Sequence, residues 1–304
     1  VERLIHELNE EGIDGLVIDL RQNGGGHLSE ATELSGLFID QGPVVQLRET
    51  RGNIQVLDDP NPDSVYNGPL AVLVDRYSAS ASEIFAAAIQ DYKRGVIIGQ
   101  QTFGKGSVQN LFDLDRFMRG SGYGQLTLTI GKYYRITGES TQHRGVMPDI
   151  SLPSIVDANL VGESTRDSAL PWDRIQQTSF MADADLDPYI ELLQTKHTER
   201  AIADPDYNYL VDNIEAAGVF RSQDNVSLNI DVRTAERETM QTQQLARENE
   251  RRMALGLNLI ENMDEVDTSE STDVLLNQAT QVVVDMATLS TSTGAPMPRS
   301  ETVS

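Results

Sequence analysis

Residues 69–99 read PLAVLVDRYSASASEIFAAAIQDYKRGVIIG, and this stretch decides the fold class. PLAVLVD (69–75) and GVIIG (95–99) are short apolar runs typical of fully buried strands. Between them, SASEIFAAAIQDY (80–92) has the periodicity of a helix. A strand, a helix and a second strand in this order form the repeating unit of a parallel sheet covered by helices.

Segments on both sides of this unit continue the alternation of strands and helices. The further elements that the pattern predicts are a buried strand at 13–20, a helix at 27–39, a strand pair at 44–49 and 53–58 around Arg51-Gly52, and a longer antiparallel strand at 125–136. We therefore expect an α/β fold with a mostly parallel sheet.

The character of the chain changes near residue 150. Prolines interrupt the following segments, and acidic helical stretches come after them, the longest at 236–257 and an amphipathic one at 272–289. The predicted organisation is a first domain at 1–150, a mainly helical acidic domain at 151–289, and a polar, disordered tail at 290–304.

The chain of 304 residues is strongly acidic, with 47 acidic and 24 basic side chains and a net charge of −23. Residues 1–150 carry 20 acids and 13 bases, and residues 151–304 carry 27 and 11. Such a net charge repels polyanions, so nucleic acid and anionic membrane surfaces are disfavoured as ligands.

Two further absences in the composition restrict the chemistry. The sequence has no cysteine, which rules out thiol catalysis, disulfides and zinc–thiolate sites and suits an oxidising compartment. It has no run of 18 apolar residues, so we expect no transmembrane segment.

The chain opens with VERLIHELNEEG and has no initiator methionine, so we expect it to be a fragment whose upstream part is missing.

The motif RYSASAS (76–82) follows a predicted buried strand and opens a predicted helix. Serines in this position often cap the helix by accepting hydrogen bonds from its first N–H groups. They can also act as nucleophiles, because the helix N-terminus stabilises a developing oxyanion. A serine hydroxyl needs a nearby base to take its proton.

Histidine and lysine are the candidate bases. His27 and His143 lie in polar turns, and no motif supports a catalytic role for either. Lys105 is one of only four lysines and lies between Gly104 and Gly106, which allow a close approach of the backbone to a neighbouring segment. A lysine base must be neutral, which requires burial, and arginine cannot replace it.

The glycine-rich loops also allow nucleotide-binding interpretations. Residues 99–105 fit the pattern GxxxxGK, but Gly106 stands where a magnesium-binding Ser or Thr is needed, and a strand-like segment follows. The turn Gly24-Gly25-Gly26 lacks the GxGxxG spacing. This turn is either a flexible connection or a source of N–H donors that no Cβ obstructs.

Four motifs in order carry a resemblance to a known family. They are DLRQNGGG (19–26), VDRYSASASEIFAAAIQDY (74–92), TFGKGSVQ (102–109) and STQHRGVMPDI (140–150). The chain resembles the carboxy-terminal processing peptidases, and most closely the tail-specific proteases of Gram-negative periplasms. The resemblance covers nearly the whole chain and implies a Ser/Lys endopeptidase with a crotonase/ClpP-like α/β core and a helical C-terminal domain.

The resemblance also implies roles for individual residues. Ser80 matches the nucleophile, Lys105 the general base and Gln109 the residue that orients this lysine. The remaining matches are the oxyanion-hole N–H groups of Ala81 and of Gly24 or Gly25, and the carboxylate of Asp91, which is expected to be structural.

The implied substrates are proteins with nonpolar C-terminal tails in the periplasm, with no cofactor and no metal, and a TPR-containing lipoprotein is the implied adaptor. Family members carry a PDZ-like domain upstream, and the chain starts after it, so we expect low activity from the fragment alone. Two alternatives stay open: a catalytically silent scaffold that binds an adaptor, and a crotonase-like acyl-CoA enzyme.

Overall fold

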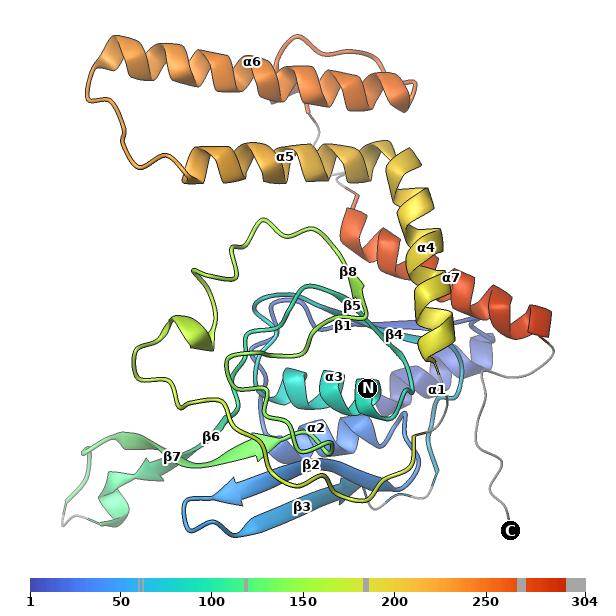
Figure 1. Cartoon of the computed structure of the whole chain (residues 1–304), viewed down its shortest axis with the longest axis vertical. Coiled ribbons are helices and arrows are strands. Elements are labelled where there is room, and N and C mark those ends of the chain that lie inside the picture. Colours follow the sequence, from blue (N-terminus) through green and yellow to red (C-terminus); the bar gives the residue numbers. More distant parts are fainter. Residues whose placement is uncertain (60, 62, 118–119, 183–185, 267–271, 294–304) are drawn as a thin grey trace.

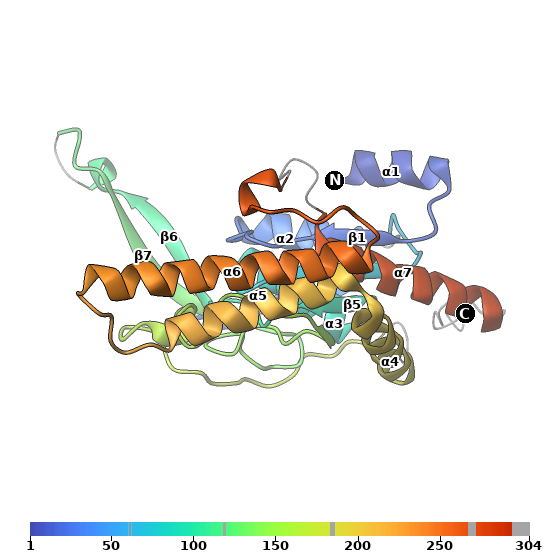
Figure 2. The ribbon, with the colours of Figure 1, turned by 90° about the horizontal axis from the view of Figure 1, so that it is seen from above.

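The computed structural model describes residues 1–59, 61, 63–117, 120–182, 186–266 and 272–293. Two four-stranded sheets and the helices packed on them form the body of the molecule, and a pair of long helices extends from it (Figure 1). Seen from above, the two long helices run side by side (Figure 2). The α/β class with a helical C-terminal region is thereby confirmed.

The first sheet is parallel and carries the strands predicted to be buried. Its order is β1 (Leu16–Asp19), β4 (Leu70–Val74), β5 (Val96–Gly99) and β8 (Ile150–Ser151). All residues of β4 and β5 are buried. Continuous apolar runs of this kind occur where both faces of a parallel sheet are covered.

The second sheet is antiparallel, so the prediction of a mostly parallel sheet describes only half of the strands. Its order is β3 (Ile54–Asp59), β2 (Gly42–Glu49), β7 (Gln125–Tyr134) and β6 (Ser107–Asp113). The physical reason is the length of the connections, because the short turn between β2 and β3 can only reverse the chain. The strand β6 forms one outer edge of this sheet.

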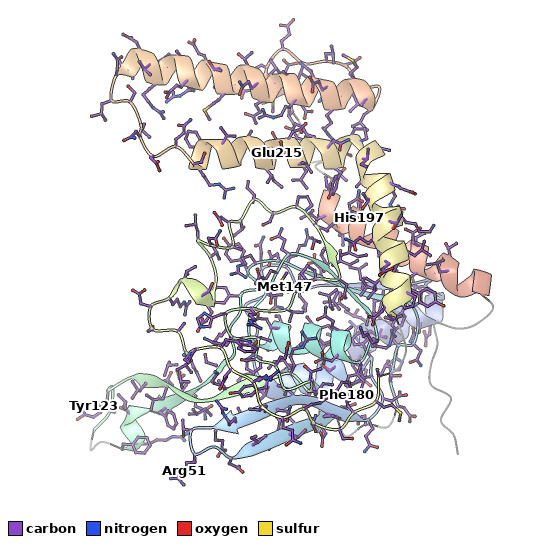
Figure 3. The ribbon with its side chains drawn as sticks, in the orientation of Figure 1. Arg51, Tyr123, Met147, Phe180, His197 and Glu215 are labelled. Carbon is purple, nitrogen blue, oxygen red and sulfur yellow. The ribbon has the colours of Figure 1, made fainter. Side chains whose placement is uncertain are left out.

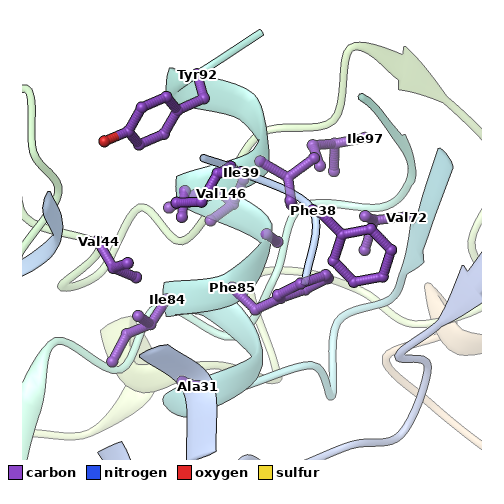
Figure 4. Close-up of a cluster of buried hydrophobic side chains, with 14 of the residues drawn as sticks. Ala31, Phe38, Ile39, Val44, Val72, Ile84, Phe85, Tyr92, Ile97 and Val146 are labelled. Atoms are coloured by element: carbon purple, nitrogen blue, oxygen red, sulfur yellow. The ribbon is translucent and has the colours of Figure 1, made fainter. Parts of the chain in front are cut away.

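Helix α3 (Ala81–Asp91) contacts strands of both sheets, β2 and β5. Its apolar side chains join the larger hydrophobic cluster, together with residues of α2 (Leu28–Ser35) and the segment after it (Figure 4). Phe85 packs edge-on against Phe38 with ring centroids 5.7 Å apart. Burial along nearly its whole length fixes α3, and with it the residue at its N-terminus.

A second hydrophobic cluster covers the other face of the parallel sheet. Residues of α7 (Val274–Thr293) and α4 (Asp187–Ala203) pack there against the side chains of β4 and β5. The region after residue 150 therefore completes the core of the region before it. The division at residue 150 stays a prediction; of the predicted tail, helix α7 includes the residues up to Thr293, and 294–304 lie outside the described residues.

Three more helices complete the chain: α1 (Glu2–Glu11), α5 (Pro205–Arg221) and α6 (Ile230–Ala254). No residue of α5 is buried, and Glu215 on this helix lies apart from both sheets (Figure 3). Polar contacts join α5 to α6, among them Arg247 to Asn213 at 3.0 Å. Within the described part of the chain, no helix has the length and apolarity needed to cross a bilayer.

Candidate active site

Ser80 lies at the turn between β4 and α3, as the N-cap residue of the helix. Its backbone has φ 59° and ψ −114°, a conformation that residues other than glycine rarely adopt. Strain of this kind persists only where the surrounding structure enforces it, and it often marks functional positions. The turn holds Ser80 at the positive end of an 11-residue helix.

Ser80 opens onto a pocket of about 560 Å³. Lys105 and Gln109 line the same pocket, as do Ala81 and Tyr133. The structure therefore brings together the three side chains that the resemblance assigned to catalysis. Among the described residues, no hydrogen bond links the Ser80 hydroxyl, the half-buried Lys105 amine and the exposed Gln109 amide.

Glu83 connects the backbone of Ser80 to that of Lys105, and sequence reasoning missed it. One carboxylate oxygen, Oε2, accepts hydrogen bonds from Ser80 N at 2.8 Å and from Lys105 N at 3.0 Å. The other, Oε1, accepts from Thr102 Oγ1 at 2.6 Å and from Gly104 N at 2.7 Å. The spacing Ser-x-x-Glu, a helix-capping pattern, could have indicated the bond to Ser80 N but not the bonds to the Lys105 loop.

The side chain of Glu83 is fully buried. Burial raises the pKa of its carboxyl to about 7, and its four hydrogen bonds oppose this rise. A carboxylate accepts all four bonds only when it is ionised, because the protonated form carries a hydrogen on one oxygen. The geometry of the two chain segments therefore depends on a charge that the protein interior destabilises.

The loop that carries Lys105 packs tightly against the segment around residues 140–143. A Cβ on Gly104, whose φ is +92°, would lie 2.9 Å from the carbonyl carbon of His143. A Cβ on Gly106 would lie 2.8 Å from the nitrogen of Gln142. The flanking glycines thus allow the close backbone approach expected from the sequence. The strand β6 follows the loop, where a nucleotide-binding loop of this type would open a helix.

Tyr133 provides a second connection between the segments that carry Ser80 and Lys105. Its phenol is buried and donates a hydrogen bond to the carbonyl of Lys105, and the carbonyl of Ser80 lies 3.3 Å from the same hydroxyl. Burial raises the pKa of Tyr133 well above its usual value, with the charge of Glu83 as a second cause, so the hydroxyl keeps its proton.

The glycine turn lies against the turn at Ser80. A Cβ on Gly25, whose φ is +91°, would lie 2.6 Å from Ala81 N. The Gly25 N–H donates to Asn23 Oδ1, and Gly24 is not among the residues of the pocket wall. Gly26 does line the pocket, and among the described residues neither its N–H nor that of Ala81 has an acceptor.

Asp91 lies at the other end of α3, eleven residues after Ser80, or about 16 Å along the helix axis. It forms an ion pair with Arg135 and does not line the pocket.

Of the histidines, His27 lines the pocket, whereas His143 Nε2 lies 2.7 Å from the carbonyl oxygen of Leu170. The described residues contain no group of three His, Asp or Glu side chains arranged to hold a metal ion.

Comparison with known proteins identifies the family. Residues 1–152 match peptidase family S41, and residues 156–288 match the C-terminal domain of tail-specific protease. The tail-specific protease of Haemophilus influenzae is 41% identical over 295 residues, which cover 94% of this chain and 42% of that protein. The chloroplastic C-terminal processing peptidase of Tetradesmus obliquus is 38% identical over 159 residues, covering 51% and 32%.

Among solved structures, the photosystem II D1 C-terminal processing protease is 35% identical, with a TM-score of 0.43 over 52% of this chain and 40% of that one. The chain spans less than half the length of these relatives. By the match to its first 152 residues, the chain belongs to peptidase family S41.

Proposed function

We propose that this chain carries the catalytic centre of a serine endopeptidase that acts through Ser80 and Lys105. The observation that supports it most is that Ser80 and Lys105 line one pocket while a single oxygen of Glu83 accepts the N–H groups of both. Family membership supports the same reaction class.

In the proposed reaction, neutral Lys105 takes the hydroxyl proton of Ser80 as Oγ bonds to the carbonyl carbon of the scissile peptide. The tetrahedral intermediate then expels the amine, which receives that proton from Lys105, and an ester on Ser80 remains. Water, deprotonated by Lys105, attacks the ester, and the collapse returns the proton to Ser80. Gln109 is proposed to orient the lysine, since it lines the same pocket.

The oxyanion of each intermediate needs two N–H donors close to Ser80. Ala81 is proposed for the first, in agreement with the resemblance, because its N–H has no acceptor among the described residues. For the second donor we propose Gly26 in place of Gly24 or Gly25, because Gly26 lines the pocket and the Gly25 N–H is engaged by Asn23.

The proposed substrates are unfolded protein segments with nonpolar C-terminal tails. The pocket supports this, because the described residues of its wall include apolar side chains such as Leu47 and Ile84 and no carboxylate. The periplasm is proposed as the compartment and a TPR-containing lipoprotein as the adaptor, both from the resemblance to the tail-specific branch. The absence of cysteine agrees with an oxidising compartment.

A cleavage assay on an unfolded protein with an apolar C-terminus tests the proposal, using the full-length protein. Ser80→Ala and Lys105→Ala are expected to abolish turnover while the circular dichroism spectrum stays unchanged, and Lys105→Arg is expected to fail as well, because arginine does not deprotonate. Ser82→Ala is the matched control, since Ser82 belongs to the same motif but donates its hydroxyl to Asn23 O. Turnover by any of the first three variants would refute the dyad.

A further inference from the structure

One edge of β6 faces the Ser80 pocket. The five consecutive residues 107–111 all line the cavity. Successive side chains of a strand point to opposite faces of its sheet. A cavity that contacts only one face would therefore be lined by every second residue and not by five in a row. The backbone edge of the strand itself must therefore form the wall. The strand begins two residues after Lys105, so this edge starts beside the catalytic amine.

Two hydrogen bonds establish which backbone groups of β6 point outward. At one end Tyr133 N donates to Gly106 O at 2.9 Å, and at the other Leu114 N donates to Gly124 O at 3.0 Å. The even-numbered residues of the strand therefore point toward β7. The pairing has one register shift, a β-bulge whose extra residue, Ile130, lies in β7. The alternating direction of the backbone groups along β6 is therefore unbroken.

It follows that Ser107, Gln109 and Leu111 direct their N–H and C=O groups away from β7, toward the open edge. Within the described part of the chain, these groups have no hydrogen-bond partner in another segment. An edge with unpaired groups is a template for another extended chain. The three residues span five positions, which correspond to about 13 Å of extended peptide.

The chemistry of the pocket defines the occupant. Among the described residues, the pocket lining includes no aspartate, glutamate or arginine, and Lys105 is its one lysine. Apolar side chains, among them Leu28, Leu47 and Ile130, supply much of the remaining wall. An unfolded segment has its backbone N–H and C=O groups free along its length, so the fitting partner is an unfolded segment without charged side chains.

We propose that an extended, uncharged segment of the substrate polypeptide pairs with Ser107, Gln109 and Leu111 as a fifth strand of the sheet β3-β2-β7-β6. This pairing rests on the proposed function and adds to it the element that aligns the scissile peptide with Ser80. Main-chain hydrogen bonds supply binding that is independent of sequence, while the apolar wall disfavours charged side chains.

Proline substitution tests the edge directly. Leu111→Pro removes one outward N–H, and proline is tolerated on an edge strand when its nitrogen faces outward. Val56→Pro is the matched control on β3, the other outer strand of the same sheet. There, Glu49 N donates to Asn53 O at 2.9 Å, so Asn53 points toward β2, and the alternation makes Val56 face outward.

With the full-length protein and an uncharged peptide substrate, Leu111→Pro is expected to lower kcat/KM about tenfold. This fold-change corresponds to the net free energy of one hydrogen bond. Val56→Pro is expected to stay within twofold of the parent, and Leu111→Ala, which keeps the N–H, is expected to lose less than the proline variant. Equal kcat/KM for Leu111→Pro and Val56→Pro, with both folded, would overturn the proposal.

Ester-containing peptides test the same point without altering the protein. Each peptide has one backbone amide replaced by an ester, which removes one N–H donor from the substrate. The expected result is a loss of about five- to tenfold in kcat/KM at positions two residues apart, with little loss between them. A loss without this alternation overturns the pairing, whereas failure to cleave any of the peptides, the all-amide parent included, overturns the proposed function itself.

Discussion

The two ends of helix α3 each hold a buried carboxylate, and the protein stabilises them in different ways. Near the N-terminus, Glu83 accepts four hydrogen bonds from uncharged donors, three of them backbone N–H groups. At the C-terminus, Asp91 forms an ion pair with Arg135, which also donates to Asp91 Oδ1 through Nε at 3.1 Å. One carboxylate organises backbone around the pocket, and the other anchors the helix to the end of β7.

The difference shows how a buried charge can be used. An ion pair such as Asp91–Arg135 fixes two side chains, and either partner leaves a buried charge behind when the other is removed. A carboxylate that accepts N–H groups fixes the backbone itself, at the positions from which Ser80 and Lys105 extend. The Ser80 end of the helix therefore gains precise backbone geometry from a carboxylate ion that its buried surroundings disfavour.

The largest expected effect is on catalysis at the Glu83 end. Glu83→Gln has an amide nitrogen that cannot accept, so two hydrogen bonds to a charged group are lost at about 2 kcal/mol each, and we expect kcat to fall about 1,000-fold. Glu33→Gln, an exposed change on α2, is the control and should leave kcat unchanged. A folded Glu83→Gln variant with parental kcat would contradict the role of this carboxylate.

The next effect is on stability at the Asp91 end. Asp91→Ala leaves Arg135 without its counter-charge in a largely buried position, so the free energy of unfolding should fall by about 3 kcal/mol. Adding Arg135→Met should recover part of the loss, as measured by urea denaturation of the single and double variants. Strict additivity of the two substitutions would show that the ion pair contributes nothing.

A smaller effect distinguishes the two carboxylates by pH. Burial raises the pKa of Glu83 to about 7, above its usual value of 4.5, so between these values the folded protein holds a proton that the unfolded chain releases. Glu83 therefore contributes stability at low pH that is lost as the pH rises through 7. Relative to Glu83→Gln, the parent should lose about 2–3 kcal/mol of unfolding free energy between pH 5 and 8. A pH-independent difference between the two proteins would contradict the raised pKa.

The smallest effect concerns Tyr133, which connects the same two segments through its hydroxyl. Tyr133→Phe leaves the buried carbonyl of Lys105 without this donor, and we expect a loss of about 1–2 kcal/mol in unfolding free energy. Thermal denaturation of the variant measures it. An unchanged stability would indicate that the hydroxyl is replaceable by other donors.

Much of this architecture could be predicted from the sequence, because the signals are local. The apolar runs of β4 and β5 can be recognised in the sequence as buried strands, and the glycines around Lys105 indicate a close approach of the backbone to a neighbouring segment. The catalytic assignment of Ser80 and Lys105 comes from the family resemblance, which the motifs around both residues carry. Their presence in one pocket agrees with that prediction, while their catalytic roles stay proposals.

Other features depend on contacts between distant segments and could not be predicted from the sequence. Glu83 looks like a helix-capping residue, and nothing local shows that it also accepts N–H groups from a loop about twenty residues later. Three consecutive glycines do not reveal which N–H faces a pocket, so the choice among Gly24, Gly25 and Gly26 needs coordinates. Likewise, the amphipathic pattern of α7 predicts an apolar face without naming the sheet that it covers.

The most direct test of the central claim is covalent labelling of the nucleophile with a fluorophosphonate, read by mass spectrometry of the digested full-length protein. Ser80 is expected to carry the label in the parent and in Ser82→Ala, and the labelling rate should fall at least about 100-fold in Lys105→Ala, since the hydroxyl then lacks its base. Labelling of a different serine, or of Ser80 at an undiminished rate without Lys105, would contradict the account.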